Sequence, residues 1–108
     1  MIIQMTQIAP NALSAEDGIK LYKKINKKLL QKEKITIDFN GINLFAPPFF
    51  NASFGRLIIE NGHEVFEKVK ITNLDDLGKE TLEYTKNILF GKNTKRISKI
   101  IEKNIFDS

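Results

Sequence analysis

The chain has 108 residues, of which 42% are hydrophobic and 28% charged, which is the length and balance of one globular domain rather than of a disordered chain or a membrane protein. It contains no cysteine, which excludes disulfides, thiolate zinc sites and cysteine nucleophiles. Its first residues lack the basic and apolar parts of a signal peptide, so we expect a cytoplasmic protein. The formal net charge of +4 is uneven: residues 1–34 carry seven basic side chains against three acids, residues 35–91 five against eight, and residues 92–108 five against two.

The N-terminal third predicts a strand followed by an amphipathic helix. Residues 1–5 are apolar, as in a short buried strand. Ser14 with Asp17 three residues later is typical of a helix start, because the serine oxygen caps a free N–H and the acid stabilises the positive end of the helix dipole. We expect a helix over residues 15–32 with a core side formed by Ile19, Tyr22, Ile25 and Leu29. The opposite face carries Lys20, Lys23, Lys24, Lys27 and Lys28.

Two further strands are predicted at residues 35–40 and 69–74, where apolar and polar side chains alternate. A strand, a long helix and a second strand have the length of a parallel crossover, which predicts an α/β layer fold. Asp75 and Asp76 then begin a helix that ends at Gly91, with one face formed by Leu77, Thr81, Tyr84 and Ile88. We assign residues 1–91 to the domain and residues 92–108 to a C-terminal amphipathic helix rich in isoleucine.

The segment with the most unusual composition is a helix predicted from Pro48 to Glu60. Proline suits the first turn of a helix because its missing N–H has no partner there. Phe50, Phe54, Leu57 and Ile58 define one apolar face, and Phe49, Ala52 and Ile59 define another. A helix that is apolar nearly all round is buried on two sides. One side is the sheet. The other is covered either by a partner protein or by the C-terminal isoleucine helix.

Catalytic patterns are not evident in the sequence. The single histidine, His63, has no second histidine at metal-binding spacing, and the glycines form no phosphate-binding motif. Asp38 is one carboxylate without a second titrating group, so we interpret it as structural. We therefore expect a protein that is not an enzyme and needs no cofactor or metal.

Residues 35–42, Ile-Thr-Ile-Asp-Phe-Asn-Gly-Ile, and residues 45–55, Phe-Ala-Pro-Pro-Phe-Phe-Asn-Ala-Ser-Phe-Gly, resemble the STAS-like domains of bacterial proteins. These domains are similar to the STAS fold of sulphate transporters and anti-sigma-factor antagonists, and the resemblance covers about residues 19–88. It implies a small mixed or parallel sheet with helices mainly on one face. It also implies that a histidine-kinase-like ATPase docks on the loop and helix that follow Asp38.

In regulatory STAS proteins a phosphorylated Ser or Thr begins that helix. Here the position falls at Pro47 or Pro48, which have no hydroxyl, and Ser53 lies inside the helix. We therefore expect a docking surface without the usual phospho-switch. Phe49, Asn51 and Ala52 are expected to face the partner. The full expected partner-binding set is Asn43, Phe45, Pro47, Pro48, Phe49, Asn51, Ala52 and Ser53.

The leading hypothesis is a regulatory protein-interaction module. The alternative is a nucleic-acid-associated protein that uses the lysine face of the first helix and the basic C-terminal segment. Few arginine or aromatic side chains accompany those lysines, so we interpret the lysine face as a solubilising surface without a ligand and do not expect nucleic acid as a partner. A sensor of small molecules at the loop ends is a third hypothesis. The sequence does not determine the oligomeric state.

Overall fold

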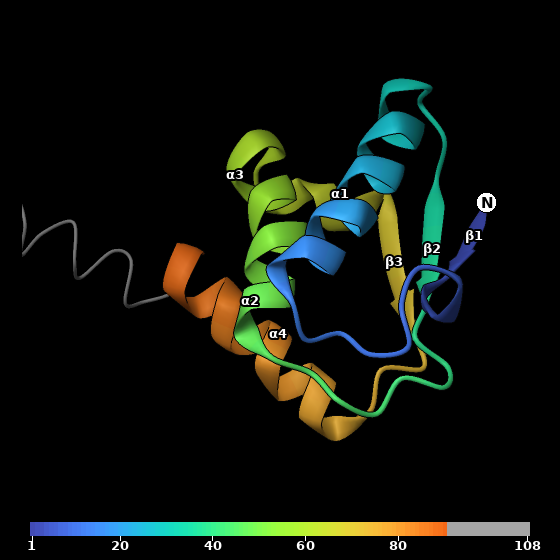
Figure 1. Cartoon of the computed structure of the whole chain (residues 1–108). Helices are drawn as coiled ribbons and strands as arrows, with labels where there is room; N and C mark the ends of the chain where they lie inside the picture. The colour runs from blue at the N-terminus through green and yellow to red at the C-terminus, as the bar shows by residue number, and fades with distance from the viewer. Residues whose placement is uncertain (91–108) are drawn as a thin grey trace, which may run out of the picture.

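The computed structural model describes residues 1–90, so the predicted helix of residues 92–108 lies outside the described residues. Three strands, β1 (Ile2–Gln4), β2 (Ile35–Asp38) and β3 (Val69–Thr72), form a parallel sheet in the order β1-β2-β3. The helices are α1 (Ala15–Leu30), α2 (Pro47–Phe50), α3 (Arg56–Asn61) and α4 (Asp76–Phe90). A π-helical turn (Asn51–Gly55) joins α2 to α3, and short 3₁₀ turns, η1 (Met5–Gln7) and η3 (His63–Glu67), flank the strands (Figure 1).

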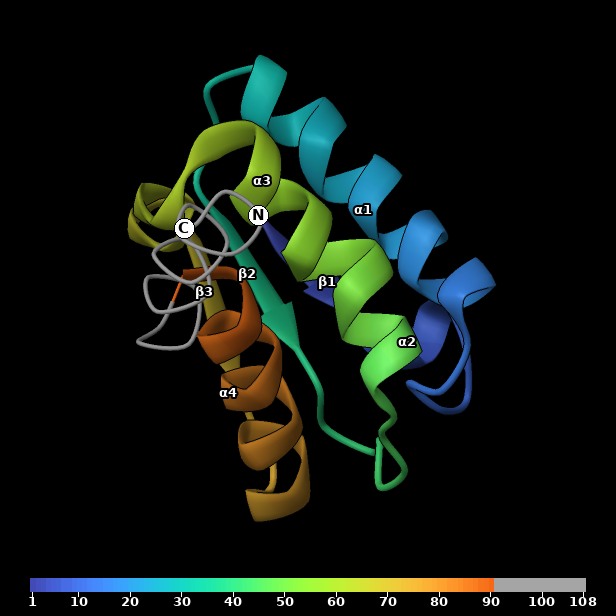
Figure 2. The same ribbon diagram turned by 90° about the vertical axis from the view of Figure 1, so that its left-hand side faces the viewer.

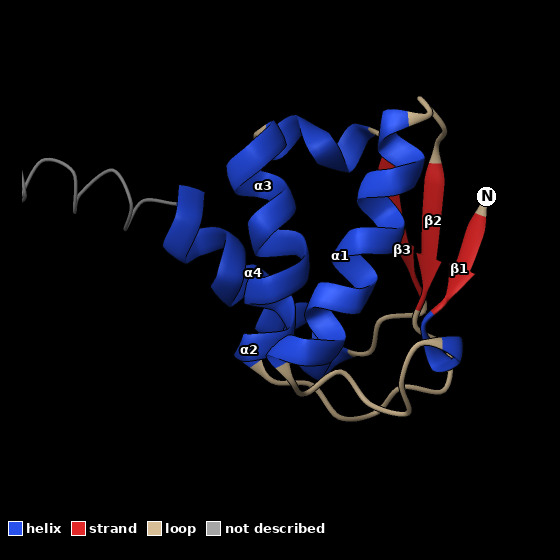
Figure 3. Cartoon of the chain, turned by 45° about the horizontal axis from the view of Figure 1, so that its top comes forward, coloured by secondary structure: helices blue, strands red, loops and turns tan. Residues whose placement is uncertain are grey.

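Within residues 1–90, the helices cover one face of the sheet and none lies on the other, which we call the bare face (Figures 1 and 3). The register places Ile3, Ile37 and Ile71 in one row, on the covered face, where Ile3 and Ile37 are buried. The neighbouring row on the bare face, Gln4, Asp38 and Thr72, is polar. The predicted α/β fold is thereby confirmed, with a purely parallel sheet. None of the helices within residues 1–90 is long and apolar enough to cross a membrane.

The helix α1 begins at the predicted residue, but the set of its side chains that faces the core differs from the predicted set. The Ser14 side chain accepts a hydrogen bond from the Asp17 backbone N–H at 3.1 Å. The buried side is formed by Gly18, Leu21, Tyr22 and Ile25, whereas Ile19 is exposed, so the predicted core position of Ile19 is wrong. Gly18 explains the orientation. Its α-carbon lies against the Phe49 carbonyl and Ala52, an approach that leaves no room for a side chain.

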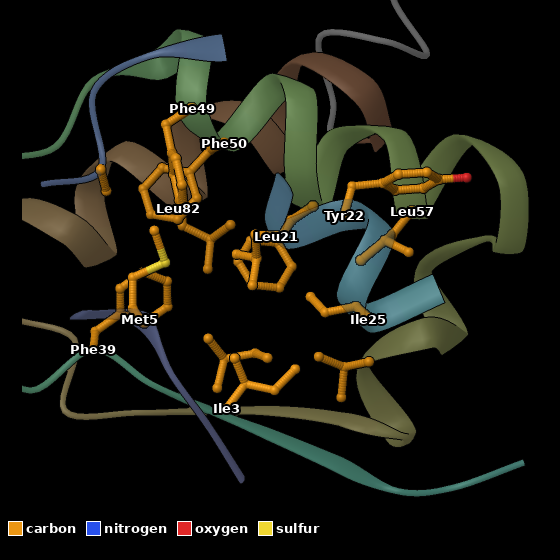
Figure 4. Packing of buried hydrophobic residues seen from close by; sticks show 14 of the residues in the cluster. Ile3, Met5, Leu21, Tyr22, Ile25, Phe39, Phe49, Phe50, Leu57 and Leu82 are labelled. Atoms are coloured by element: carbon orange, nitrogen blue, oxygen red, sulfur yellow. The ribbon is translucent and has the colours of Figure 1, made fainter. Parts of the chain in front are cut away.

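Residues 47–61, which we call the phenylalanine helix, run continuously through α2, the π turn and α3. This helix lies in the middle of the helical layer, between α1 and α4 (Figure 2). Phe49, Phe50 and Phe54 are completely buried, and their ring centres lie 6.2 to 6.5 Å from that of Phe39, at the end of β2 (Figure 4). The two-sided burial predicted for this helix is therefore supplied within the chain, by the sheet and the two neighbouring helices.

The helix α4 is also turned away from the predicted orientation. The predicted face of Leu77, Thr81, Tyr84 and Ile88 lies mainly on the surface, and Tyr84 is 54% exposed. The buried side instead contains Gly78, Leu82 and Thr85. A β-carbon at Gly78 would lie 2.9 Å from the Phe45 ring, so this glycine marks the side on which α4 packs closely against the domain. The face that the sequence outlines with Leu77, Tyr84 and Ile88 is therefore not the buried face of α4.

Candidate functional site

The candidate site is built from the two loops that leave the carboxyl ends of β1 and β2, which is where open parallel sheets place their binding residues. The first loop spans residues 8–14 and the second spans residues 39–46. They are joined by two backbone hydrogen bonds of 3.0 Å, from the Ala12 N–H to the Leu44 carbonyl and from the Ala46 N–H to the Ala12 carbonyl. The loops run side by side beyond the ends of the strands (Figure 3).

This bridge determines which loop side chains face outward. Ala12 and Phe45 form the bridging pair and are buried. Residues next to a bridging pair point to the opposite face, and Leu13 and Leu44 are accordingly 40% and 51% exposed. Pro47 and Pro48 follow directly and are exposed. We define the loop surface as Leu13, Asn43, Leu44, Pro47, Pro48 and Asn51.

Hydrogen bonds of the Asp38 side chain and the backbone conformation of Gly41 fix the turn that precedes the loop surface. The Asp38 carboxylate accepts hydrogen bonds from the Asn73 side-chain amide at 2.8 Å and from the Asn40 backbone N–H at 3.0 Å. These bonds lower the pKa of Asp38, with the bond from Asn73 as the larger cause. Gly41 has a φ of 92°, which favours glycine, and the Ile42 N–H donates to the Phe39 carbonyl at 3.0 Å. Asp38 therefore joins the ends of β2 and β3, in agreement with its structural interpretation.

The structure divides the predicted partner-binding residues into two groups. Asn43, Pro47, Pro48 and Asn51 are exposed. Phe45, Phe49 and Ser53 are buried, and Ala52 is half-buried.

The expectation that Phe49 faces a partner is wrong, because its side chain has no exposed surface. Phe49 points into the core of the domain (Figure 4), and the helix face beside it is covered by α1 at the contact between Gly18 and Ala52. Ala52 thus lies at an internal helix contact rather than at the centre of a free face. Phe45 packs against Phe50 in a stacked arrangement with ring centres 6.0 Å apart.

Ser53 is buried in the middle of the phenylalanine helix. Its hydroxyl donates a hydrogen bond to the Phe49 carbonyl at 2.8 Å, and its side chain has no exposed surface. A kinase has no access to a hydroxyl in this position while the helix is folded. The two residues at the helix start, Pro47 and Pro48, carry no hydroxyl. Neither position offers an accessible phosphate acceptor.

The lysine face lies on the outer side of α1. Lys20, Lys23, Lys24 and Lys27 are exposed, and Lys28 is half-buried. Lys20 lies 3.6 Å from the Asp17 carboxylate and Lys28 lies 3.9 Å from that of Glu33, so two of the five cations are near acids. No aromatic side chain for stacking is exposed on this face of α1.

Sequence reasoning missed Leu13 and Leu44, because no periodic pattern marks a residue in a loop. A signal was nevertheless present. Residues 1–15 and 39–55 contain no charged side chain, in a chain that is 28% charged. The fold brings these two uncharged segments together at the loop surface. Among residues 1–90, no cluster of three or more His, Asp or Glu side chains is arranged to hold a metal ion.

These features define an α/β domain with a parallel three-stranded sheet, one layer of helices and an uncharged loop surface at the carboxyl ends of its strands. The model of one protein family, described as a STAS-like domain of unknown function, matches residues 17–79. This match covers more than half of the chain, and the chain therefore belongs to that family. Neither a curated protein nor a solved structure matches the chain.

Proposed function

We propose that this protein is a non-enzymatic regulatory module that binds a partner protein through the loop surface. The observation that carries the proposal is the exposure of Leu44, which shares the outward face of the two paired loops with Leu13, on an uncharged part of the molecule. Single exposed leucines are common, but two apolar side chains on one face without charges have the composition of an interface centre. The domain's remaining surface is rich in lysine and glutamate, which interfaces disfavour.

The loop surface is also held rigid before any partner arrives. The two backbone bonds of the Ala12 bridge fix one loop on the other, and Pro47 and Pro48 restrict the backbone at the start of the phenylalanine helix. Buried Phe45 anchors the segment between them. A surface that is already ordered loses less conformational entropy on binding, which favours a docking role for these residues.

A histidine-kinase-like ATPase is the partner class that the family resemblance implies. The buried Ser53 hydroxyl and the two prolines argue that binding is not controlled by phosphate at the helix start. We propose instead a constitutive contact, which is regulated by the abundance or the state of the partner.

The test uses a purified histidine-kinase-like ATPase domain from the organism that produces this protein. Its binding is measured to the wild type and to three aspartate variants. Leu44→Asp places a charge at the centre of the loop surface and should weaken binding by about tenfold or more, as expected for an interface anchor. Leu30→Asp and Ile59→Asp are matched controls, because these side chains are 77% and 68% exposed outside the loop surface. They should bind like the wild type. Equal binding by all three variants, with circular dichroism showing that each is folded, would reject the loop surface.

The same assay separates this proposal from the nucleic-acid alternative. Lys24→Glu changes the exposed lysine face and leaves the loop surface intact. Our proposal predicts that Lys24→Glu binds the ATPase normally and that the wild type shows no salt-dependent binding to duplex DNA. Steep salt-dependent DNA binding that Lys24→Glu abolishes would support the alternative instead.

A further inference from the structure

The second feature of the molecule that suggests binding is the free edge of β3. The sheet order places β3 at one end, and within residues 1–90 no strand pairs with it on the side away from β2. Natural proteins usually cover, charge or shorten such edges, because an open strand readily pairs with another chain. The helix α4 packs on the covered face of the sheet, next to this edge (Figure 2).

The backbone of β3 shows which groups are available for pairing. The Lys68 and Thr72 carbonyls both accept hydrogen bonds of 2.9 Å from β2, from the Ile35 and Phe39 N–H groups. In a parallel ladder, alternate residues direct their backbone groups to the same neighbour. The N–H and carbonyl groups of Val69 and Ile71 therefore point away from β2, toward the open edge.

A hollow of about 490 Å³ adjoins this edge, between β3, η3 and α4. Its apolar lining includes Phe66, Ile71, Leu74 and Leu82, and its remaining walls include Lys79 and Lys86. The Lys86 ammonium lies 4.4 Å from the centre of the Phe66 ring and 3.4 Å from the Glu83 carboxylate. The hollow thus has an apolar floor and basic walls, directly next to strand groups that no other strand of residues 1–90 pairs with.

We propose that the β3 edge binds an extended acidic segment of another protein as a fourth strand. On the face of the added strand that lies over the hollow, apolar side chains would enter the hollow, and acidic side chains two residues away would approach Lys79 and Lys86. Strand addition of this kind obtains affinity from backbone hydrogen bonds and specificity from pockets for alternate side chains. The required partner is therefore an extended segment in which apolar and acidic residues take turns at every second position, on one face of the strand.

Charge argues against the two other occupants that the chain itself could supply. Residues 92–108 carry five basic side chains against two acids, which is the wrong sign for a hollow bordered by two lysines. A second copy paired edge to edge would bring another Lys79 and Lys86 to the same junction. Both arrangements place like charges together, which is unfavourable in an interface.

The probe is a synthetic peptide of about ten residues, long enough for an ordinary strand, in which valine and glutamate take turns at every second position and threonine stands between them. The full-length protein is titrated with it and followed by ¹H–¹⁵N spectra and hydrogen exchange. We expect the exchange of the Val69 and Ile71 amide protons to slow. A peptide with lysine in place of glutamate should bind at least about tenfold more weakly because its charges oppose those of the hollow.

Two N-methylated peptides test the strand geometry without changing the protein. Methylation of every valine and glutamate nitrogen blocks one edge of the peptide strand, and methylation of every threonine nitrogen blocks the other. Pairing with β3 uses one edge only, so one of these peptides should lose binding and the other should retain it. Loss with both or with neither would overturn strand addition.

The double variant Lys79→Glu, Lys86→Glu should bind the glutamate peptide about tenfold more weakly, whereas Lys23→Glu, Lys24→Glu on α1 should bind it normally.

Protection of the Val69 and Ile71 amides before any peptide is added would overturn the proposal. Concentration-dependent protection would identify a second copy as the occupant, and concentration-independent protection would identify the C-terminal segment. Leu44→Asp should leave peptide binding unchanged, so this proposal and that for the loop surface fail independently.

Discussion

Replacing Gly18 by alanine should push α1 away from the phenylalanine helix and destabilise the domain. A β-carbon at this position would overlap the Phe49 carbonyl oxygen, and it would lie 2.9 Å from the Ala52 β-carbon. The main obstacle is backbone inside a helix, which does not rotate out of the way. The two helices must therefore separate, or the backbone of one must shift.

The magnitude follows from two opposing effects. In a helix without close contacts, glycine to alanine gains about 1 kcal/mol through helix propensity. Extra volume in a well-packed contact costs about 1–3 kcal/mol, because a gap of about 1 Å already loses up to about half of the dispersion attraction along it. Overlap with backbone places Gly18 at the upper end of that range. We therefore expect a net loss of about 2 kcal/mol in the free energy of unfolding.

Urea denaturation followed by circular dichroism measures this loss, with Gly55→Ala as the matched control. A β-carbon at Gly55 would lie 3.3 Å from the Phe50 carbonyl oxygen and 3.4 Å from Leu89, so alanine fits there with a small shift. Gly55→Ala should match the wild type within about 1 kcal/mol. Adding Ala52→Gly should not rescue Gly18→Ala, because the carbonyl remains. A Gly18→Ala protein as stable as the wild type would refute the close contact of α1 with the phenylalanine helix.

Three further predictions test other parts of the structure. Leu82→Ala should lower the free energy of unfolding by about 2–5 kcal/mol and Tyr84→Ala by less than about 1 kcal/mol, as measured by urea denaturation; the reverse order would contradict the orientation of α4. Ser53→Asp should cost about 3 kcal/mol or more, because it buries an unpaired carboxylate, and a fully stable variant would show that this position is accessible. Hydrogen bonds lower the pKa of folded Asp38, so its contribution to stability is complete above about pH 4 and is lost as the pH falls through the lowered pKa. Asp38→Asn should therefore lose less stability than the wild type between pH 6 and pH 3 in urea titrations, and an equal loss would exclude this role.

The strands and the start of α1 could be predicted because their signals are local. The cap at Ser14 depends on residues three positions apart, and the alternation in β2 depends on neighbours. Local patterns of this kind do not require knowledge of the rest of the fold. The parallel arrangement followed from the length of the helix between two strands.

The orientations of α1 and α4 could not be predicted from apolar periodicity, since both helices are apolar on more than one side. Ile19 and Leu21 are both apolar, yet only Leu21 is buried. The same is true of Tyr84 and Leu82 in α4. In each case a glycine, Gly18 or Gly78, marks the side of closest approach, and that side depends on which helix lies opposite.

The docking surface was only partly predictable, for a related reason. The phenylalanine helix does need a second covering surface, but α1 and α4 supply it, so Phe49 is internal. Leu13 and Leu44 are distant in sequence, and the bridge at Ala12 brings them to one face of the paired loops, which no periodicity reveals. Asn43 and the two prolines are exposed, as a loop before a helix usually is.

The most direct test of the loop surface is site-specific photo-crosslinking in cells. A benzophenone amino acid is introduced at position 44 and, as the matched control, at position 59, whose isoleucine is 68% exposed on α3. Our account predicts one discrete adduct from position 44, its loss when Leu13→Asp is added, and none from position 59. Adducts of equal yield from both positions, or an adduct that Leu13→Asp does not affect, would contradict it.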